Sequence, residues 1–135
     1  MIVADANVVA YLILKGDNNE LARAVYFADP EWHLPALWRH EYLNVLVSAI
    51  RFRKTPLATA ESAWEQARAL FASAEHEVEP KAAMALAVRY GISAYDAQYV
   101  ALAEQLDVTL VTQDGPLRSA CPERAISMQA FCDAR

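Results

Sequence analysis

The sequence predicts an α/β fold of three layers, in which a mostly parallel β-sheet lies between helices on both faces. Short apolar segments of strand-like composition alternate with longer segments of helical periodicity. Apolar residues make up 56% of the 135 residues, an excess that suggests either a sheet covered on both faces or an oligomer interface. Asp5 and Asp114 lie just past the carboxyl ends of two of the strand-like runs, which is where ligands bind in an open α/β sheet. The length and the absence of a linker or repeat predict one domain over residues 1–135.

Four elements are expected before residue 36. In order, they are a strand within Met1–Asn7, a helix over Val8–Leu14, a helix over Glu20–Ala28 and a strand over Trp32–Leu34. The turn cluster Gly16–Asn19 separates the two helices, and Pro30 and Pro35 bound the second strand, because proline interrupts regular backbone pairing.

Two long helices follow. The first, Leu37–Phe52, has helical apolar spacing and places Glu41 beside an apolar stripe that faces the core. Thr55-Pro56 opens the second, which is expected to reach about Ala74, because a cap residue followed by proline is a typical helix start.

The middle of the chain predicts a short edge strand and two more helices. The strand is expected within His76–Glu79, and Pro80 begins a helix that continues to Tyr90. Gly91 suits the left-handed residue that ends a helix. Ser93–Asp96 matches a capping box and opens a helix to about Leu106.

The carboxyl-terminal part adds two strands and one helix. Val108–Thr112 is rich in β-branched residues and predicts a strand, with Gln113–Pro116 as its exit turn. A final strand is expected near Ala125–Ser127, before a terminal helix from Met128.

Four carboxylates are expected to converge. Asp5 and Asp114 follow parallel strands, whereas Glu41 and Asp96 lie on helix faces that must turn toward the sheet. Converging carboxylates raise one another's pKa unless a cation neutralises them, and oxygen ligands suit Mg²⁺ or Mn²⁺ rather than zinc. The pattern therefore predicts a metal site.

Each of these acids also has a purely structural explanation. Asp5 or Asn7 can cap the first helix, and Asp114 can form a turn before glycine. Asp96 can serve only in the capping box, and Glu41 can reach solvent or a buried arginine. Taken jointly, the four acids favour the metal site.

Four short motifs resemble those of the PIN domain in order and rough spacing. They are Val-Ala-Asp5-Ala-Asn7-Val-Val, Arg-His-Glu41-Tyr-Leu-Asn, Ala-Tyr-Asp96-Ala-Gln-Tyr and Leu-Val-Thr112-Gln-Asp114. In length and layout the chain resembles a VapC-type toxin of a toxin–antitoxin pair. The resemblance implies a three-layer PIN-like fold in which the four acids are the catalytic, metal-binding quartet, supported by Asn7 and Thr112. Many members carry another acid soon after the last aspartate, whereas Pro116, Leu117 and Arg118 follow it here.

The resemblance implies a Mg²⁺- or Mn²⁺-dependent endoribonuclease that acts as the toxin of a type II toxin–antitoxin system. A metal ion in such a cluster activates water for attack on a phosphodiester, which leaves a 5′-phosphate and a 3′-hydroxyl. The expected partners are RNA, a cognate antitoxin with a basic or amphipathic segment across the acidic site, and a second copy of the chain.

The net charge of −5 argues against broad electrostatic attraction to nucleic acid, so RNA must meet a local basic patch. Arg51, Arg53 and Lys54 form the densest group of cations, and Arg39 lies near Glu41. The alternative for the group of three is stabilisation of a helix carboxyl end. With no long apolar run or basic leader, the protein is expected in the cytoplasm, without a membrane partner.

Two other functions remain open from the sequence: a catalytically idle PIN-like protein-interaction module and a structure-specific DNA nuclease. A zinc protease is disfavoured because Asn44 stands where the second histidine of His-Glu-x-x-His belongs. Nucleotide binding has no support, since the chain has three glycines and no phosphate-binding loop.

Overall fold

A computed structural model describes all residues from Met1 to Arg135, and its centre is a five-stranded sheet with every pairing parallel. The strand order is β3-β2-β1-β4-β5. The strands are β1 (Ile2–Ala4), β2 (Trp32–Pro35), β3 (Glu75–His76), β4 (Leu110–Val111) and β5 (Ala125–Ile126). The predicted parallel α/β architecture is confirmed.

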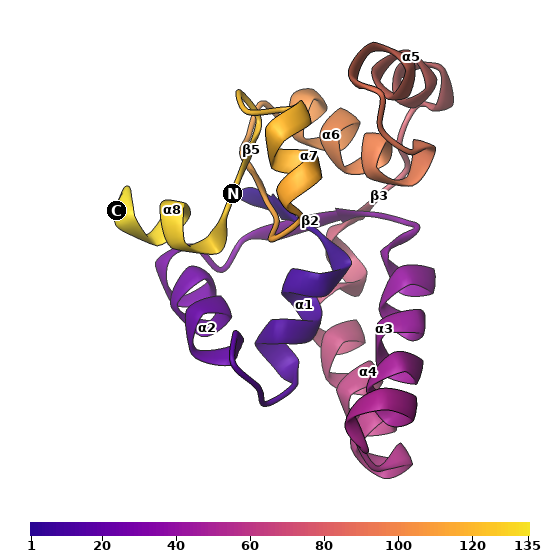
Figure 1. The fold of residues 1–135 in the computed structure, drawn as a ribbon, viewed down its shortest axis with the longest axis vertical. Helices are drawn as coiled ribbons and strands as arrows, with labels where there is room; N and C mark the ends of the chain where they lie inside the picture. Colours follow the sequence, from indigo (N-terminus) through magenta and orange to yellow (C-terminus); the bar gives the residue numbers. More distant parts are fainter.

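Helices cover both faces of the sheet and complete the three layers (Figure 1). One face carries α1 (Ala6–Ile13), α2 (Asn19–Ala28), α3 (Trp38–Arg53), α4 (Leu57–Phe71) and α8 (Met128–Asp133). The other face carries α5 (Pro80–Tyr90), α6 (Ala94–Leu106) and α7 (Gly115–Ala120). None of these helices combines the length and the apolar composition needed to cross a membrane.

The alternation of side chains along the central strand produces two separate cores. Ile2 and Ala4 of β1 join the core formed with α1 to α4, whereas Val3 joins the core formed with α5 to α7. The first core is rich in aromatic rings: Trp32 stacks on Phe71 with ring centroids 5.5 Å apart. The strands are thus buried on both faces, which accounts for their almost entirely apolar sequences.

Several boundaries differ from the sequence-based expectation; for example, the strand expected over Val108–Thr112 is only Leu110–Val111. The segment after β4 is not only a turn, because Gly115–Ala120 forms α7 with Pro116 in its first turn. The edge strand is Glu75–His76 rather than His76–Glu79, since Glu75 pairs in register with Leu34 of β2. Helix α4 ends at Phe71, and a single 3₁₀ turn, Ala72–Ala74, leads into β3.

The order in which the chain adds strands to the sheet reverses at β1. The segments β2 and β3 add to one side of β1, and β4 and β5 add to the other. A crevice opens at such a switch point beyond the carboxyl ends of the strands. Asp5 follows β1 and Asp114 lies shortly after β4, so both residues stand at this crevice.

Candidate active site

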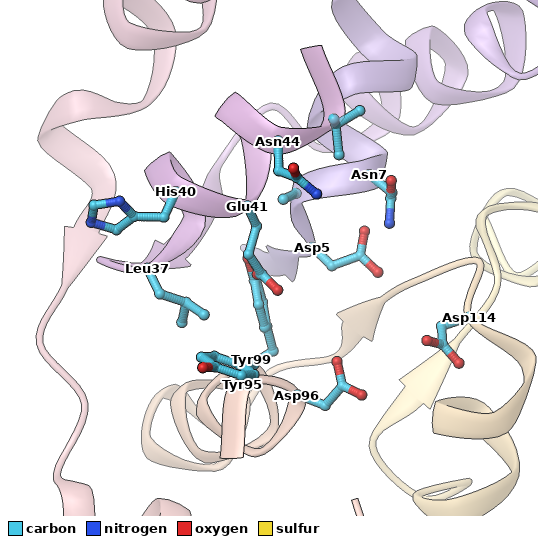
Figure 2. A pocket seen from close by; sticks show the side chains of 12 residues that line it. Asp5, Asn7, Leu37, His40, Glu41, Asn44, Tyr95, Asp96, Tyr99 and Asp114 are labelled. Carbon is cyan, nitrogen blue, oxygen red and sulfur yellow. The ribbon is translucent and has the colours of Figure 1, made fainter. Parts of the chain in front are cut away.

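A cavity of about 770 Å³ opens at the switch point, and four acidic side chains line it (Figure 2). Asp5 comes from the β1–α1 junction, Glu41 from the first turn of α3, Asp96 from the first turn of α6 and Asp114 from the start of α7. The structure therefore brings together the four acids that the sequence singled out, from positions as much as 109 residues apart, counted from Asp5 to Asp114.

Asp5 is held by hydrogen bonds to both carboxylate oxygens. Its Oδ1 accepts the backbone N–H of Val8 at 2.9 Å, and its Oδ2 accepts the hydroxyl of Thr112. Thr112 is completely buried. Burial is the main cause that raises the pKa of Asp5 to about 6, with repulsion from Glu41 and Asp114 adding to it and the two hydrogen bonds opposing it. Asp5 thus caps α1 and lines the cavity at once.

Glu41 meets a tyrosine rather than a buried arginine. The Tyr99 hydroxyl donates a 2.6 Å hydrogen bond to Glu41 Oε1, and the Tyr99 side chain is almost fully buried in α6. Burial raises the pKa of Glu41, and Asp96 raises it further by repulsion, against the effect of the hydrogen bond. The second oxygen of Glu41 accepts no hydrogen bond from the protein.

Asp96 and Asp114 combine helix capping with positions in the cavity. The backbone N–H of Asp96 donates to Ser93 Oγ at 3.0 Å, which completes the cap of α6, while the Asp96 carboxylate accepts no protein hydrogen bond. Burial and repulsion from Asp114 raise the pKa of Asp96. Asp114 Oδ1 accepts the N–H of Leu117 at 2.9 Å and caps α7. For Asp114 the structural and the functional explanations are therefore compatible, whereas the reciprocal capping-box bond from the Ser93 N–H to the Asp96 carboxylate is not formed.

The donor set of the cavity fits a hydrated hard cation. No lysine or arginine lines the cavity, so no side chain of fixed positive charge offsets the four acids. No three histidine, cysteine or acidic side chains stand close enough to bind one ion directly. Mg²⁺ commonly keeps several waters and uses one or two carboxylates, and this arrangement provides for that.

From the sequence, no site role was assigned to four polar side chains of the cavity, which belong to His40, Asn44, Tyr95 and Tyr99 (Figure 2). Asn44 lies three positions after Glu41, and Tyr99 three positions after Asp96, so helical spacing alone places each on the same face as its acid. Asn7, the predicted supporting residue, lines the cavity as expected. The helical spacing was a usable signal for Asn44 and Tyr99, but the pairing of Tyr99 with Glu41 was not visible in it.

The predicted basic residues do not line this cavity. Arg39 faces Glu75, with Nη2 3.0 Å from Oε2. Arg51, Arg53 and Lys54 stand at the opposite end of α3, and Arg53 is about 18 Å from Glu41 along the helix axis at 1.5 Å per residue.

Comparisons with known proteins bear on the family and the fold of the chain. Residues 2–121 match the family model described as PIN domain. The chain is 34% identical to Ribonuclease VapC3 of Pyrobaculum aerophilum over 125 residues, which are 90% of this chain and 95% of that protein. A crystal structure of a protein from Pyrobaculum aerophilum matches with a TM-score of 0.78 and 22% identity, over 98% of this chain and 94% of that one. A toxin–antitoxin complex from Klebsiella pneumoniae matches with a TM-score of 0.69 and 17% identity, over 95% and 98% of the two chains.

Proposed function

The chain belongs to the PIN domain family, and we propose that it is a metal-dependent endoribonuclease that acts as the toxin of a type II toxin–antitoxin pair. The observation that carries the proposal is the convergence of Asp5, Glu41, Asp96 and Asp114 on one cavity that no lysine or arginine enters. Idle acids in this setting would cost stability, because burial and mutual repulsion disfavour their charged forms. The name of the relative VapC3 supports RNA as the substrate.

We assign the four acids to Mg²⁺ or Mn²⁺ binding and catalysis, with Asn7 and Thr112 in support. When bound, the ion supplies activation of water and neutralisation of charge on the phosphodiester. Thr112 holds Asp5 through its hydroxyl, and Asp114 in turn donates its backbone N–H to Thr112 Oγ1 at 3.1 Å. These contacts keep two of the acids in fixed positions before any substrate binds, which lowers the reorganisation needed for catalysis.

An antitoxin is the proposed protein partner. The toxin–antitoxin complex from Klebsiella pneumoniae shares this fold, which supports an antitoxin as the partner of this chain. The acidic cavity and the net charge of −5 favour an inhibitor segment that carries positive charge. We also propose that the chain forms a homodimer.

Cleavage of a small-RNA pool by purified, antitoxin-free protein tests the proposed activity. The reaction is run with Mg²⁺, with Mn²⁺ and with EDTA, and beside it stand the variants Asp96→Asn and Glu104→Gln. Both positions lie on α6, but Glu104 is exposed and lies outside the cavity, so it is the matched control. We expect metal-dependent fragments with 5′-phosphate ends from the wild-type and Glu104→Gln proteins, and none from folded Asp96→Asn protein.

The same experiment separates the competing functions. Cleavage of a DNA hairpin in preference to an RNA hairpin of matched sequence would replace the ribonuclease with a DNA nuclease. No cleavage of either, together with no heat of Mn²⁺ binding in calorimetry, would leave a non-catalytic interaction module as the better account.

A further inference from the structure

A groove leads from the acidic cavity along α1 and α3. These two helices pack against each other and both run away from the sheet edge (Figure 1). The groove shares Asn7 and Val45 with the cavity, so the two spaces adjoin. At its far end it shares Leu14, Lys15 and Arg53 with a second hollow beside α4. A continuous surface depression thus joins the four acids to the carboxyl ends of α1 and α3.

Three cations gather at this far end. Lys15 follows α1, Arg53 is the last residue of α3, and Lys54 is the left-handed residue that caps it. All three are exposed, and none lies within 4.0 Å of a carboxylate oxygen. Asp17 is the single acid that lines this part of the groove. The positive charge is therefore available to a ligand.

Only some of the basic residues that the sequence analysis grouped together lie along this groove. Arg53 lines both the groove and the hollow at its far end, and Lys54 lines that hollow, whereas Arg51 lines neither. Lys15, which the sequence did not single out, lines it from a separate segment. Cations at helix carboxyl ends also stabilise helix dipoles, but that role does not require two helix ends to share one groove with an acidic cavity.

We propose that Lys15, Arg53 and Lys54 bind the phosphates of a single RNA strand whose cleaved bond lies in the acidic cavity. This inference rests on the proposed ribonuclease function. The path of about 18 Å from Glu41 to Arg53 spans at most roughly five nucleotides at the stacked-duplex rise of about 3.4 Å per nucleotide, and fewer for an extended strand. Tyr11 lines the groove between the two ends, where its side chain packs against the core and stays partly exposed.

The arrangement also resolves a problem of charge. The four acids repel the phosphates that surround the cleaved bond, and the protein as a whole carries a charge of −5. Cations several nucleotides away hold the strand without neutralising the acids themselves. Binding and metal-dependent chemistry are thereby assigned to opposite ends of one groove.

Binding of a fluorescein-labelled, 20-nucleotide single-stranded RNA of mixed sequence tests the proposal. The protein carries Asp96→Asn to prevent cleavage, and fluorescence anisotropy is measured over a range of salt concentrations. We expect the double variant Lys15→Ala with Arg53→Ala to weaken RNA binding about tenfold. The plot of log affinity against log salt concentration should also become less steep, by about 1.4 in the magnitude of its slope, because each lost phosphate contact removes about 0.7. The charge-conserving pair Lys15→Arg with Arg53→Lys should restore both quantities.

A matched control removes the same charge elsewhere. Arg23 and Arg89 are exposed and line neither the cavity nor the groove, so their double alanine variant should retain RNA affinity within about twofold. Equal weakening by the groove pair and the control pair would mean that only net charge matters, and it would overturn the proposal. An unchanged affinity of the groove pair would overturn it as well.

The outcome is separable from that of the proposed activity. If wild-type protein cuts RNA but the groove pair binds RNA normally, the ribonuclease stands and the binding path is wrong. If no cleavage occurs but the groove pair alone loses RNA affinity, the binding surface stands and the enzymatic proposal fails.

Discussion

The hydroxyl of Tyr99 donates a 2.6 Å hydrogen bond to Glu41 across 58 residues of sequence. The bond connects α6 with α3 beside the cavity, and the donor is almost fully buried. A neutral donor at this place favours the charged form of Glu41, whose pKa is otherwise raised by burial and by Asp96. Tyr99 thereby positions one of the four acids and keeps it available for a cation.

Replacing Tyr99 with phenylalanine should impair Mn²⁺ binding and RNA cleavage without unfolding the protein. Loss of a hydrogen bond to a metal-binding carboxylate costs about 10- to 100-fold in metal affinity or activity. Calorimetric Mn²⁺ titration at pH 7.5 measures the first quantity and kcat the second. Tyr90→Phe is the control, because the Tyr90 hydroxyl makes no hydrogen bond and lies outside the cavity. Equal metal affinity of wild-type and Tyr99→Phe proteins would contradict the positioning role.

Asp5→Asn should stabilise the metal-free protein at pH 7.5. The pKa of Asp5 rises from 3.8 to about 6 on folding, so the folded state binds the proton more tightly. The stability that the Asp5 carboxyl group contributes by binding this proton is fully present below about pH 3.8, and it is lost as pH rises through about 6. The difference between the two pKa values corresponds to a change in the free energy of unfolding of about 3 kcal/mol at most. An asparagine can still accept the Val8 N–H and can donate to Thr112.

The pH dependence of that gain is the decisive measurement. Urea unfolding in EDTA should show Asp5→Asn more stable than wild type at pH 7.5, with the difference shrinking toward zero near pH 4. Comparing the two proteins at each pH cancels the titrating groups that do not interact with Asp5, among them His76, whose pKa is lowered by burial and by His33. A constant difference across this range would show that relief of buried charge is not the cause.

Phe71→Ala should destabilise the protein by about 3–5 kcal/mol, because it leaves a cavity under the stacked ring of Trp32. Phe27→Ala is its control, since Phe27 is 92% exposed. The control should change the free energy of unfolding by less than about 0.5 kcal/mol. Denaturant unfolding of the two variants measures both values, and similar losses would contradict the assigned core.

Glu75→Ala should cost more stability than Arg39→Ala, although the two residues form one ion pair. Glu75 also accepts the indole N–H of buried Trp38 at 2.6 Å, so its removal leaves that donor unpaired at a cost of about 1–3 kcal/mol. Removing Arg39 breaks only a partly exposed ion pair, worth about 1 kcal/mol or less. Thermal and urea unfolding of both variants measure the difference. The reverse order of stabilities would show that the arginine dominates this contact.

Local patterns were sufficient to predict most elements, because each strand and helix had to bury a recognisable apolar face. The local patterns did not predict the correct structure where a segment is short and polar. Gly115–Ala120 forms α7 because Asp114 caps it, yet Asp-Gly-Pro is equally typical of a turn. Strand β3 exists because Glu75 and His76 pair with β2, a long-range contact that two residues of sequence cannot indicate.

The sequence by itself determined the parallel α/β class and the identity of the four acids, since strand ends and helix faces are set by periods of two and 3.6 residues. The tertiary structure alone decided the partners of those acids, such as Tyr99 for Glu41 and Thr112 for Asp5. It also decided which cations share a groove with them, and selected Lys15 and Arg53 but not Arg51. The physical reason is that such contacts depend on how separate elements pack across the switch point of the sheet, which no local pattern encodes.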